Sequence, residues 1–288
     1  MLFNRRNFIK NIGLSLGSLG LINTSYLEAS ITSQKKSKFI QNFYLQLHKW
    51  HCENFYDFDK QFHQIEKNYV KKCIELMDDW AYQVNENFVY SLASYSHHIS
   101  KQGVNSSRIS FGSYKFSEQL KPYLQEVLKL RSIPLNILDN KKAIGLGWDF
   151  ETGAFKVYFH HENLSTINDN DLLSLKKQVT DSIYSNGLSS YSFHGNKLVE
   201  KKLYVALHEK LPQRFKQLFS KTDKISHTNL MVSSTRGVIP QMDLEQYNFK
   251  TLDQNGQRLF KEYKTTFGNQ LDTISYNTKD SYTLYFPH

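Results

Sequence analysis

Cysteine is scarce in this chain: 288 residues contain only Cys52 and Cys73. The two lack the paired spacing of a zinc site, which excludes a fold organised around structural zinc. Both lie in segments that we expect to be helical, so pairing is geometrically possible in an exported protein. A disulfide and two free helical thiols are the two alternatives.

Proline is also scarce, and long apolar runs are missing after the N-terminus. Five prolines beside 18 Tyr and 20 Phe favour a fold with many β-strands, because aromatic residues suit strands and proline interrupts them. After residue 30 no run is long and apolar enough for a membrane-spanning helix. The length fits one large domain or two small ones, with enough hydrophobic residues for a sizeable core.

Blocks of like charge are missing as well. The formal net charge is +9, yet basic residues alternate with acidic ones along the chain. A basic chain can bind nucleic acid, an anionic surface or a phosphorylated small molecule. A solvated basic surface is the default interpretation unless a local cluster of cations argues otherwise.

The first 30 residues have the pattern of an export signal. Asn4–Lys10 contains paired arginines followed by a hydrophobic residue and a lysine, and a weakly hydrophobic run follows over 12–22. This is similar to a twin-arginine signal, although the cleavage site is a loose match. We expect 31–288 to form a single domain, periplasmic if the signal is used and cytoplasmic if it is not.

Two N-terminal helices are expected within 31–85, over 36–51 and 57–80, from apolar residues at helical spacing. The second ends at Asp78-Asp79, which invites comparison with the acidic magnesium ligands of some prenyl and terpene enzymes. No third acid follows four residues later. We therefore interpret this pair as a solvated helix end and expect no metal site.

From about residue 86 the hydrophobic period changes to two, which predicts hairpins alternating with helices. In the clearest hairpin, Lys156 and Tyr158 share one face of a strand, whereas Phe155, Val157 and Phe159 share the other. The expected hairpins span 88–114, 143–160, 189–207, 229–246 and 272–287, and the expected connecting helices span 117–131, 169–184, 211–219 and 253–267.

Units that recur about every 45 residues indicate a repeat architecture. Five hairpins supply ten antiparallel strands, and closing them into a barrel leaves no exposed strand edge. Connecting helices can then cover the apolar outer faces. The expected fold class is α+β: a ten-stranded antiparallel β-barrel built from five αββ repeats, with the helices outside.

Polar residues recur on the returning strand of each expected hairpin, and Lys-x-Tyr occurs in two successive units. If these side chains point into the barrel, they suit an anion of high charge such as a diphosphate. The alternative places them on a solvated outer face. The candidates are Arg108, Lys156, Tyr158, Lys202, Tyr204, Gln241, Asp243, Tyr282 and Tyr285.

This succession of units, with Lys-x-Tyr on returning strands, resembles the aromatic prenyltransferases of the ABBA type (PT barrel) over about residues 85–288. It looks closest to the dimethylallyltryptophan-synthase-like branch. The resemblance implies transfer of a dimethylallyl or longer group from its diphosphate to an indole or phenol acceptor, in a small molecule or peptide. It implies no cofactor and no nucleic-acid partner. The implied diphosphate ligands are Arg108, Lys156, Tyr158, Lys202, Tyr204, Gln241, Tyr282 and Tyr285.

The residue types agree with that chemistry. Lysine and arginine can neutralise the leaving diphosphate without magnesium, and aromatic faces can shield the allylic cation. An electron-rich ring then attacks, and a base takes its proton. Glu86 is the nearest candidate for the acidic residue that serves as base, although its register is a few residues off.

Two acidic residues depart from the family's pattern. Glu200 stands where a basic residue is common, and Asp243 stands where a tyrosine is usual. Both would weaken anion binding if they point inward. Trp148 lies in the barrel region, where packing and acceptor stacking are the two readings.

Three functions therefore remain open. The chain is a prenyltransferase, a non-catalytic barrel that binds an anionic or aromatic small molecule, or a basic barrel that binds nucleic acid through exposed aromatic and basic residues. The direction of Lys156 and Lys202 separates them. Inward lysines support the first two functions, and outward lysines support the third.

Overall fold

A computed structural model describes the barrel region of the chain. The described residues are 72, 75–76, 93–100, 103–112, 117–149, 154–179, 183–208, 224–246, 252–267, 273–278 and 281–287. The signal segment, both cysteines, Asp78-Asp79, Glu86 and the helix expected over 211–219 lie outside them. No described helix is long and apolar enough to cross a membrane.

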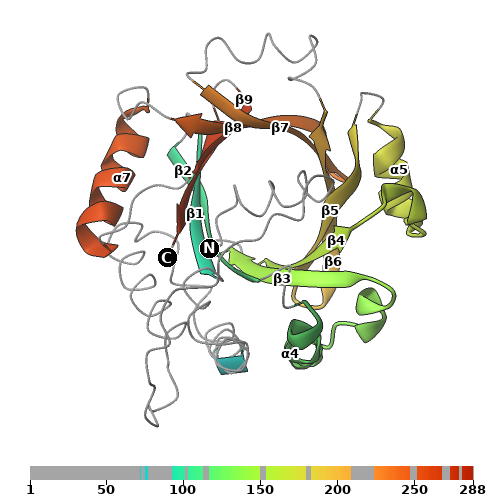
Figure 1. Ribbon diagram of the computed structural model, residues 1–288. Coiled ribbons are helices and arrows are strands. Elements are labelled where there is room, and N and C mark those ends of the chain that lie inside the picture. Colours follow the sequence, from blue (N-terminus) through green and yellow to red (C-terminus); the bar gives the residue numbers. More distant parts are fainter. Residues whose placement is uncertain are drawn as a thin grey trace, which may run out of the picture.

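The described strands form a closed antiparallel barrel (Figure 1), in the order β1-β10-β9-β8-β7-β6-β5-β4-β3-β2. They are β1 (Ala93–Ser100), β2 (Gly103–Gly112), β3 (Lys142–Asp149), β4 (Phe155–His161), β5 (Ile183–His194), β6 (Lys197–Leu207), β7 (Lys224–Ser233), β8 (Gly237–Gln246), β9 (Thr273–Thr278) and β10 (Ser281–Pro287). The first strand pairs with the last, so the sheet has no free edge. The expected antiparallel barrel is thereby confirmed, whereas five complete αββ repeats stay a prediction.

Helices lie outside the barrel wall (Figure 1). Those that the structure describes in full include α4 (Ser117–Leu130), α5 (Asn170–Lys177) and α7 (Gln254–Phe267), with the short 3-10 helices η3 (Leu135–Leu138) and η4 (Leu164–Thr166). The expectation of one helix over 169–184 is wrong at its C-terminal end, because β5 begins at Ile183. Val179, Thr180 and Ile183 are β-branched, which favours a strand over a helix in this segment.

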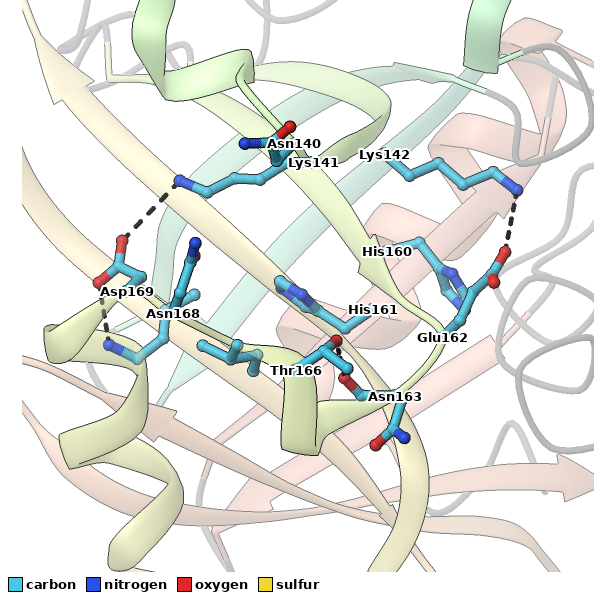
Figure 2. Close-up of a pocket in the computed structure, with 12 residues that line it drawn as sticks. Asn140, Lys141, Lys142, His160, His161, Glu162, Asn163, Thr166, Asn168 and Asp169 are labelled. Carbon is cyan, nitrogen blue, oxygen red and sulfur yellow. Dashed lines mark hydrogen bonds and ion pairs between the residues drawn. The ribbon is translucent and has the colours of Figure 1, made fainter.

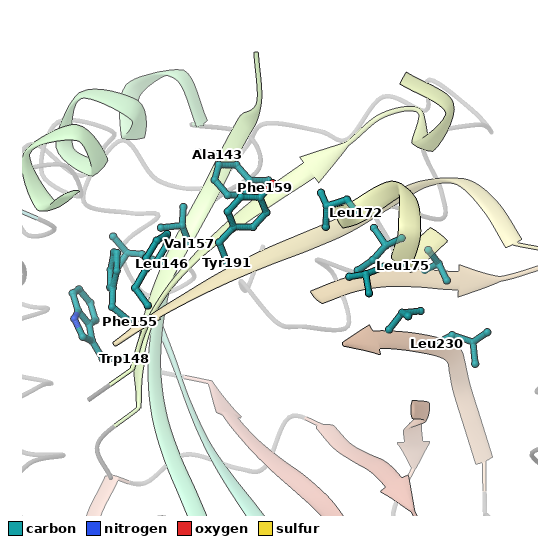
Figure 3. Close-up of a cluster of buried hydrophobic side chains, with 14 of the residues drawn as sticks. Ala143, Leu146, Trp148, Phe155, Val157, Phe159, Leu172, Leu175, Tyr191 and Leu230 are labelled. Carbon is teal, nitrogen blue, oxygen red and sulfur yellow. The ribbon is translucent and has the colours of Figure 1, made fainter. Parts of the chain in front are cut away.

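The outer face of the wall is apolar and covered. Phe155, Val157 and Phe159 of β4 are fully buried in one cluster with side chains of α4 and α5, and Figure 3 shows part of this layer. Trp148 belongs to the same layer and lies 5.5 Å from Phe155 between ring centroids. Trp148 therefore packs against the outer core. The opposite face of β4, with Lys156 and Tyr158, faces the lumen.

A polar cluster fastens α5 to the barrel. Asp169 caps the helix by accepting hydrogen bonds from the amides of Asp171 and Leu172. Its other oxygen accepts a hydrogen bond from Tyr191, and Lys201 donates to it at 3.0 Å. Burial alone would raise the pKa of Asp169, but these hydrogen bonds outweigh it and lower the pKa to about 2. The cluster is therefore ionised at neutral pH and holds a helix rather than a ligand.

Candidate functional site

Long polar residues alternate with small ones on the inner face of the wall. Directly paired residues on neighbouring strands share a face, so the pairing identifies the inner set. One row contains Ser110, Gly147, Lys156, Ser192 and Glu200, and the next contains Gly112, Gly145, Tyr158, Ser190, Lys202 and Ser233. Lys156, Tyr158 and Lys202 thus have Gly or Ser on both sides, whereas Tyr204 lies between Leu188 and Met231.

Arg108, Asp149 and Lys156 form one half of the inner charged group. Arg108 lies directly opposite Asp149, with Nη2 2.6 Å from Oδ1 and Nε donating to the same oxygen at 2.7 Å. The ammonium of Lys156 lies 3.8 Å from Oδ2 of Asp149. Nη1 of Arg108 also lies 3.5 Å from the Tyr158 hydroxyl. A single carboxylate therefore lies between two cations.

The surroundings of Lys156 disfavour its positive charge. Its side chain is 5% exposed. Burial lowers its pKa well below the usual value, repulsion by Arg108 lowers it further, and attraction to Asp149 only partly opposes this. Burial would raise the pKa of Asp149, but Arg108 and Lys156 outweigh burial and lower it. An additional anion beside Lys156 would relieve the repulsion between the cations.

Glu200, Lys202 and Arg236 form the other half. Glu200 faces inward, where Lys202 lies 3.0 Å from Oε2 and Arg236 donates through Nε at 3.3 Å to Oε1. Ser233 and Thr235 also donate to Oε1, at 2.5 and 3.0 Å. Burial would raise the pKa of Glu200, but Lys202 and Ser233 outweigh it and lower the pKa to about 2. The carboxylate is ionised and neutralised in place, so the three charged groups together stay positive.

We call these six residues the lumen cluster. It contains four cations, Arg108, Lys156, Lys202 and Arg236, and two carboxylates, Asp149 and Glu200. With both lysines protonated, the cluster has two positive charges in excess. Burial, Arg236 and Arg108 lower the pKa of Lys202, as expected for cations crowded without a further counter-ion.

Three tyrosines share the inner face with this cluster. Tyr158, Tyr204 and Tyr285 all raise the pKa of Arg108 together with Asp149, against the effect of burial. Ser96 lies opposite both Arg108 and Tyr285, so Tyr285 shares their inner face. The structure therefore places three of the expected tyrosines on the same inner face as the expected arginine, and Tyr158 contacts it.

Gln241 is 5% exposed and lies in β8 on the far wall. Its amide donates to Oδ1 of Asn277 at 2.8 Å and contacts the sulfur of Met231 at 3.9 Å. Asp243 also lies in β8, but its side chain is outside what the structure describes.

His98 is an inner residue that the sequence reasoning missed. Its ring nitrogens lie 3.2 Å from the Thr283 hydroxyl and 3.1 Å from the Ser281 hydroxyl. Burial lowers its pKa to about 4, and the charges of Arg236, Arg108 and Lys202 contribute. The imidazole is therefore neutral at physiological pH, and the positive field of the lumen cluster extends to β1.

Tyr282 does not belong to this set, and its predicted place in the lumen is wrong. It precedes Tyr285 by three residues, an odd spacing that puts the two on opposite faces of β10. Tyr282 is 5% exposed in the outer core, where its hydroxyl donates to Asp253 at 2.8 Å beside α7. Its ring lies 5.5 Å from Tyr276 between centroids.

Replacing Tyr282 by Phe is expected to lower the free energy of unfolding by about 1 kcal/mol, because the hydrogen bond to Asp253 is lost. Binding of pyrophosphate should be unchanged, since the side chain faces away from the lumen. Denaturant unfolding and titration calorimetry measure the two effects. Tyr285→Phe is the matched variant on the inner face and should weaken pyrophosphate binding. Weaker binding in Tyr282→Phe would contradict its outward placement.

A cavity of about 420 Å³ lies between the ends of β3 and β4, η4 and the start of α5 (Figure 2). Its charged groups pair with one another: Lys141 lies 3.8 Å from Asp169, and Lys142 lies 3.5 Å from Glu162. Burial lowers the pKa of His160 to about 4. The cavity thus has no excess charge, and the lumen is the stronger candidate site.

Comparisons with known proteins give likeness of fold only. No family model matches the chain, and no curated protein matches it. The structure of 5-dimethylallyl tryptophan synthase from Streptomyces coelicolor in complex with DMASPP and Trp is similar with a TM-score of 0.49 and 8% identity, covering 75% of this chain and 89% of that one. A second structure of this synthase has a TM-score of 0.48 and 9% identity, covering 75% and 91%.

Proposed function

We propose that this chain is an aromatic prenyltransferase. It moves a dimethylallyl or longer prenyl group from its diphosphate to an indole or phenol ring, in a small molecule or a peptide, without magnesium. The observation that carries the proposal is the lumen cluster, in which cations outnumber carboxylates and two of the cations, Lys156 and Lys202, are nearly fully buried inside a closed wall. A diphosphate supplies the charge that this cluster needs.

The first chemical step is ionisation of the allylic diphosphate. The carbon–oxygen bond breaks and pyrophosphate leaves with the electron pair, so negative charge grows on its oxygens. Lys156, Lys202 and Arg108 stabilise this charge, and the tyrosine hydroxyls donate hydrogen bonds to it. This neutralisation is the task that magnesium performs elsewhere, which supports a metal-independent reaction.

The second step is capture of the allylic cation by the acceptor ring. A ring carbon forms the new carbon–carbon bond, and the proton on that carbon then passes to a base. The faces of Tyr158 and Tyr204 suit stabilisation of the cation. The closed wall limits access of water, which would otherwise trap the cation as an alcohol. Glu86 remains the base suggested by the sequence resemblance.

A non-catalytic binding barrel is the second candidate function. Glu200 inside the lumen favours it, because a carboxylate paired with Lys202 at 3.0 Å competes with a phosphate for that ammonium. The nucleic-acid alternative loses its support, since Lys156 and Lys202 face inward and are nearly fully buried.

The test incubates the full chain with dimethylallyl diphosphate, EDTA and a panel of tryptophan, small phenols and a tryptophan-containing peptide. Mass spectrometry should find a product heavier by one prenyl group, and adding magnesium in place of EDTA should not raise its yield. Absence of product with retained pyrophosphate binding would favour the binding barrel. Absence of both product and binding would overturn both functions.

A further inference from the structure

The hairpin turn between β7 and β8 holds an arginine at the end of the lumen. Gly237 adopts a φ of 71°, a left-handed conformation that this tight turn needs and that glycine adopts without strain. The Ser233 hydroxyl accepts hydrogen bonds from the amides of Thr235 and Arg236, at 3.2 and 3.1 Å. The backbone that presents Arg236 is therefore fixed by the residue that also donates to Glu200.

In its contact with Glu200, Arg236 uses only one of its three side-chain nitrogens. It donates to Glu200 through Nε, and within the described part of the chain its two terminal nitrogens make no hydrogen bond. Its charge nevertheless contributes to lowering the pKa values of both His98 and Lys202. The charge of the guanidinium thus acts on residues of opposite walls of the lumen, and its two terminal nitrogens are still available as donors.

Ser192 provides an independent observation at the same place. It lies between Lys156 and Glu200 in their row of paired residues and is 2% exposed. Among the described residues, nothing forms a hydrogen bond with its hydroxyl. A buried hydroxyl without a partner costs free energy unless a ligand satisfies it.

The order of residues along β6 gives the direction in which a ligand lies. Glu200 is nearest the β5–β6 turn, Lys202 follows, and Tyr204 is farther from that turn. An apolar prenyl chain suits the position beside the tyrosines, away from the turn. The phosphate farthest from the prenyl carbon then lies at the turn end, beside Arg236.

We propose that Arg236, Ser192 and Lys202 form a subsite for the terminal phosphate of the prenyl diphosphate, with Glu200 as the positioning residue. The subsite rests on the proposed function for its ligand. The terminal phosphate has more charge than the ester phosphate, and a guanidinium fork matches its oxygens. The basic group absent from position 200 of β6 is thereby supplied from the neighbouring hairpin, and Glu200 orients it.

The direct test compares binding of dimethylallyl diphosphate and dimethylallyl monophosphate by titration calorimetry. Arg236→Gln should weaken binding of the diphosphate about tenfold and change binding of the monophosphate less than twofold. Ser192→Ala should weaken diphosphate binding by about threefold. Arg258→Gln removes the same charge from the exposed face of α7 and should change neither ligand's affinity.

The positioning role of Glu200 has its own readout. If Glu200 orients Arg236, Arg236→Gln should cost less affinity in a Glu200→Gln background than in the wild-type chain. Equal costs would assign Glu200 no positioning role.

Lys156→Met separates failure of the subsite from failure of the proposed function. Unchanged diphosphate affinity in Arg236→Gln, with affinity lost in Lys156→Met, would overturn the subsite and leave the proposed function standing. Failure of the wild-type chain to bind the diphosphate would overturn both.

Discussion

Lys156→Met should lose about a hundredfold or more in prenyl-transfer rate and yet unfold at a higher temperature than the wild-type protein. On the proposed function, the rate falls because the buried ammonium no longer stabilises the charge of the leaving diphosphate. Stability rises because burial and repulsion by Arg108 both disfavour the ammonium, and Met fills its volume without charge. Asp149 keeps its close partner Arg108, so no carboxylate is left unpaired. The gain should be about 1 kcal/mol or more, or roughly 2–4 °C.

The pH dependence of that gain has a defined sign. The pKa of Lys156 is lower in the folded chain than in the unfolded chain. Between the two values the unfolded chain binds more protons, so this lysine destabilises the fold less as the pH rises. The advantage of Lys156→Met should therefore be largest near neutral pH and shrink toward pH 10.5, the usual pKa of lysine.

Lys201→Met is the matched control for this variant. Lys201 is the neighbour of Lys202 on β6 but faces outward, where it lies 3.0 Å from Asp169 and 2.8 Å from Asp171. Its replacement should lower stability and leave prenyl transfer unchanged. A Lys156→Met protein that is less stable than wild type, or that keeps its rate, would show that the ammonium is not a strained phosphate ligand.

Asp149→Asn should destabilise the protein by about 3–5 kcal/mol, because Arg108 and Lys156 then lose the carboxylate that they share. Thermal unfolding should move down by roughly 10 °C. Pyrophosphate should restore much of this loss, since it supplies negative charge to the same two cations. The shift that saturating pyrophosphate causes should accordingly be larger in the variant than in wild type.

Asp171→Asn serves as the control for the same chemical change. Asp171 also pairs with a lysine, at 2.8 Å, but its side chain is 69% exposed. Its replacement should cost less than about 1 kcal/mol, and pyrophosphate should stabilise it as it does the wild type. An Asp149→Asn protein with wild-type stability and an ordinary response to pyrophosphate would contradict the shared-carboxylate arrangement.

Local sequence patterns predicted that the strands form a barrel wall, and they predicted which side chains of β4 face inward and which face outward. The alternation in β4 separated Lys156 and Tyr158 from three large apolar residues, and the structure places the two groups on opposite faces. Tyr282 was misplaced although the same rule was available, because its odd spacing from Tyr285 already indicated opposite faces. The early end of α5 was missed because apolar spacing alone outweighed the β-branched residues after it.

The charged contacts of the lumen depend on register between strands, which local patterns do not contain. Arg108 and Asp149 are 41 positions apart, and Glu200 and Arg236 are 36 apart. The sequence predicted that Glu200 would weaken anion binding. It did not show that the next hairpin places the Arg236 guanidinium beside this carboxylate. Ser192 gave no signal in the sequence, since a serine in a strand is distinguished only by the partners that it lacks.

The seam between β1 and β10 also affects how the chain folds. His98 and Ser281, joined across this seam, are 183 positions apart. A growing chain leaves the edge of β1 that pairs with β10 exposed to solvent until residues 281–287 have been made. Contacts of such long range are slow to form, and an unpaired edge invites association between chains in the meantime. Protection of the β1 edge during synthesis should therefore affect how much protein forms the closed barrel.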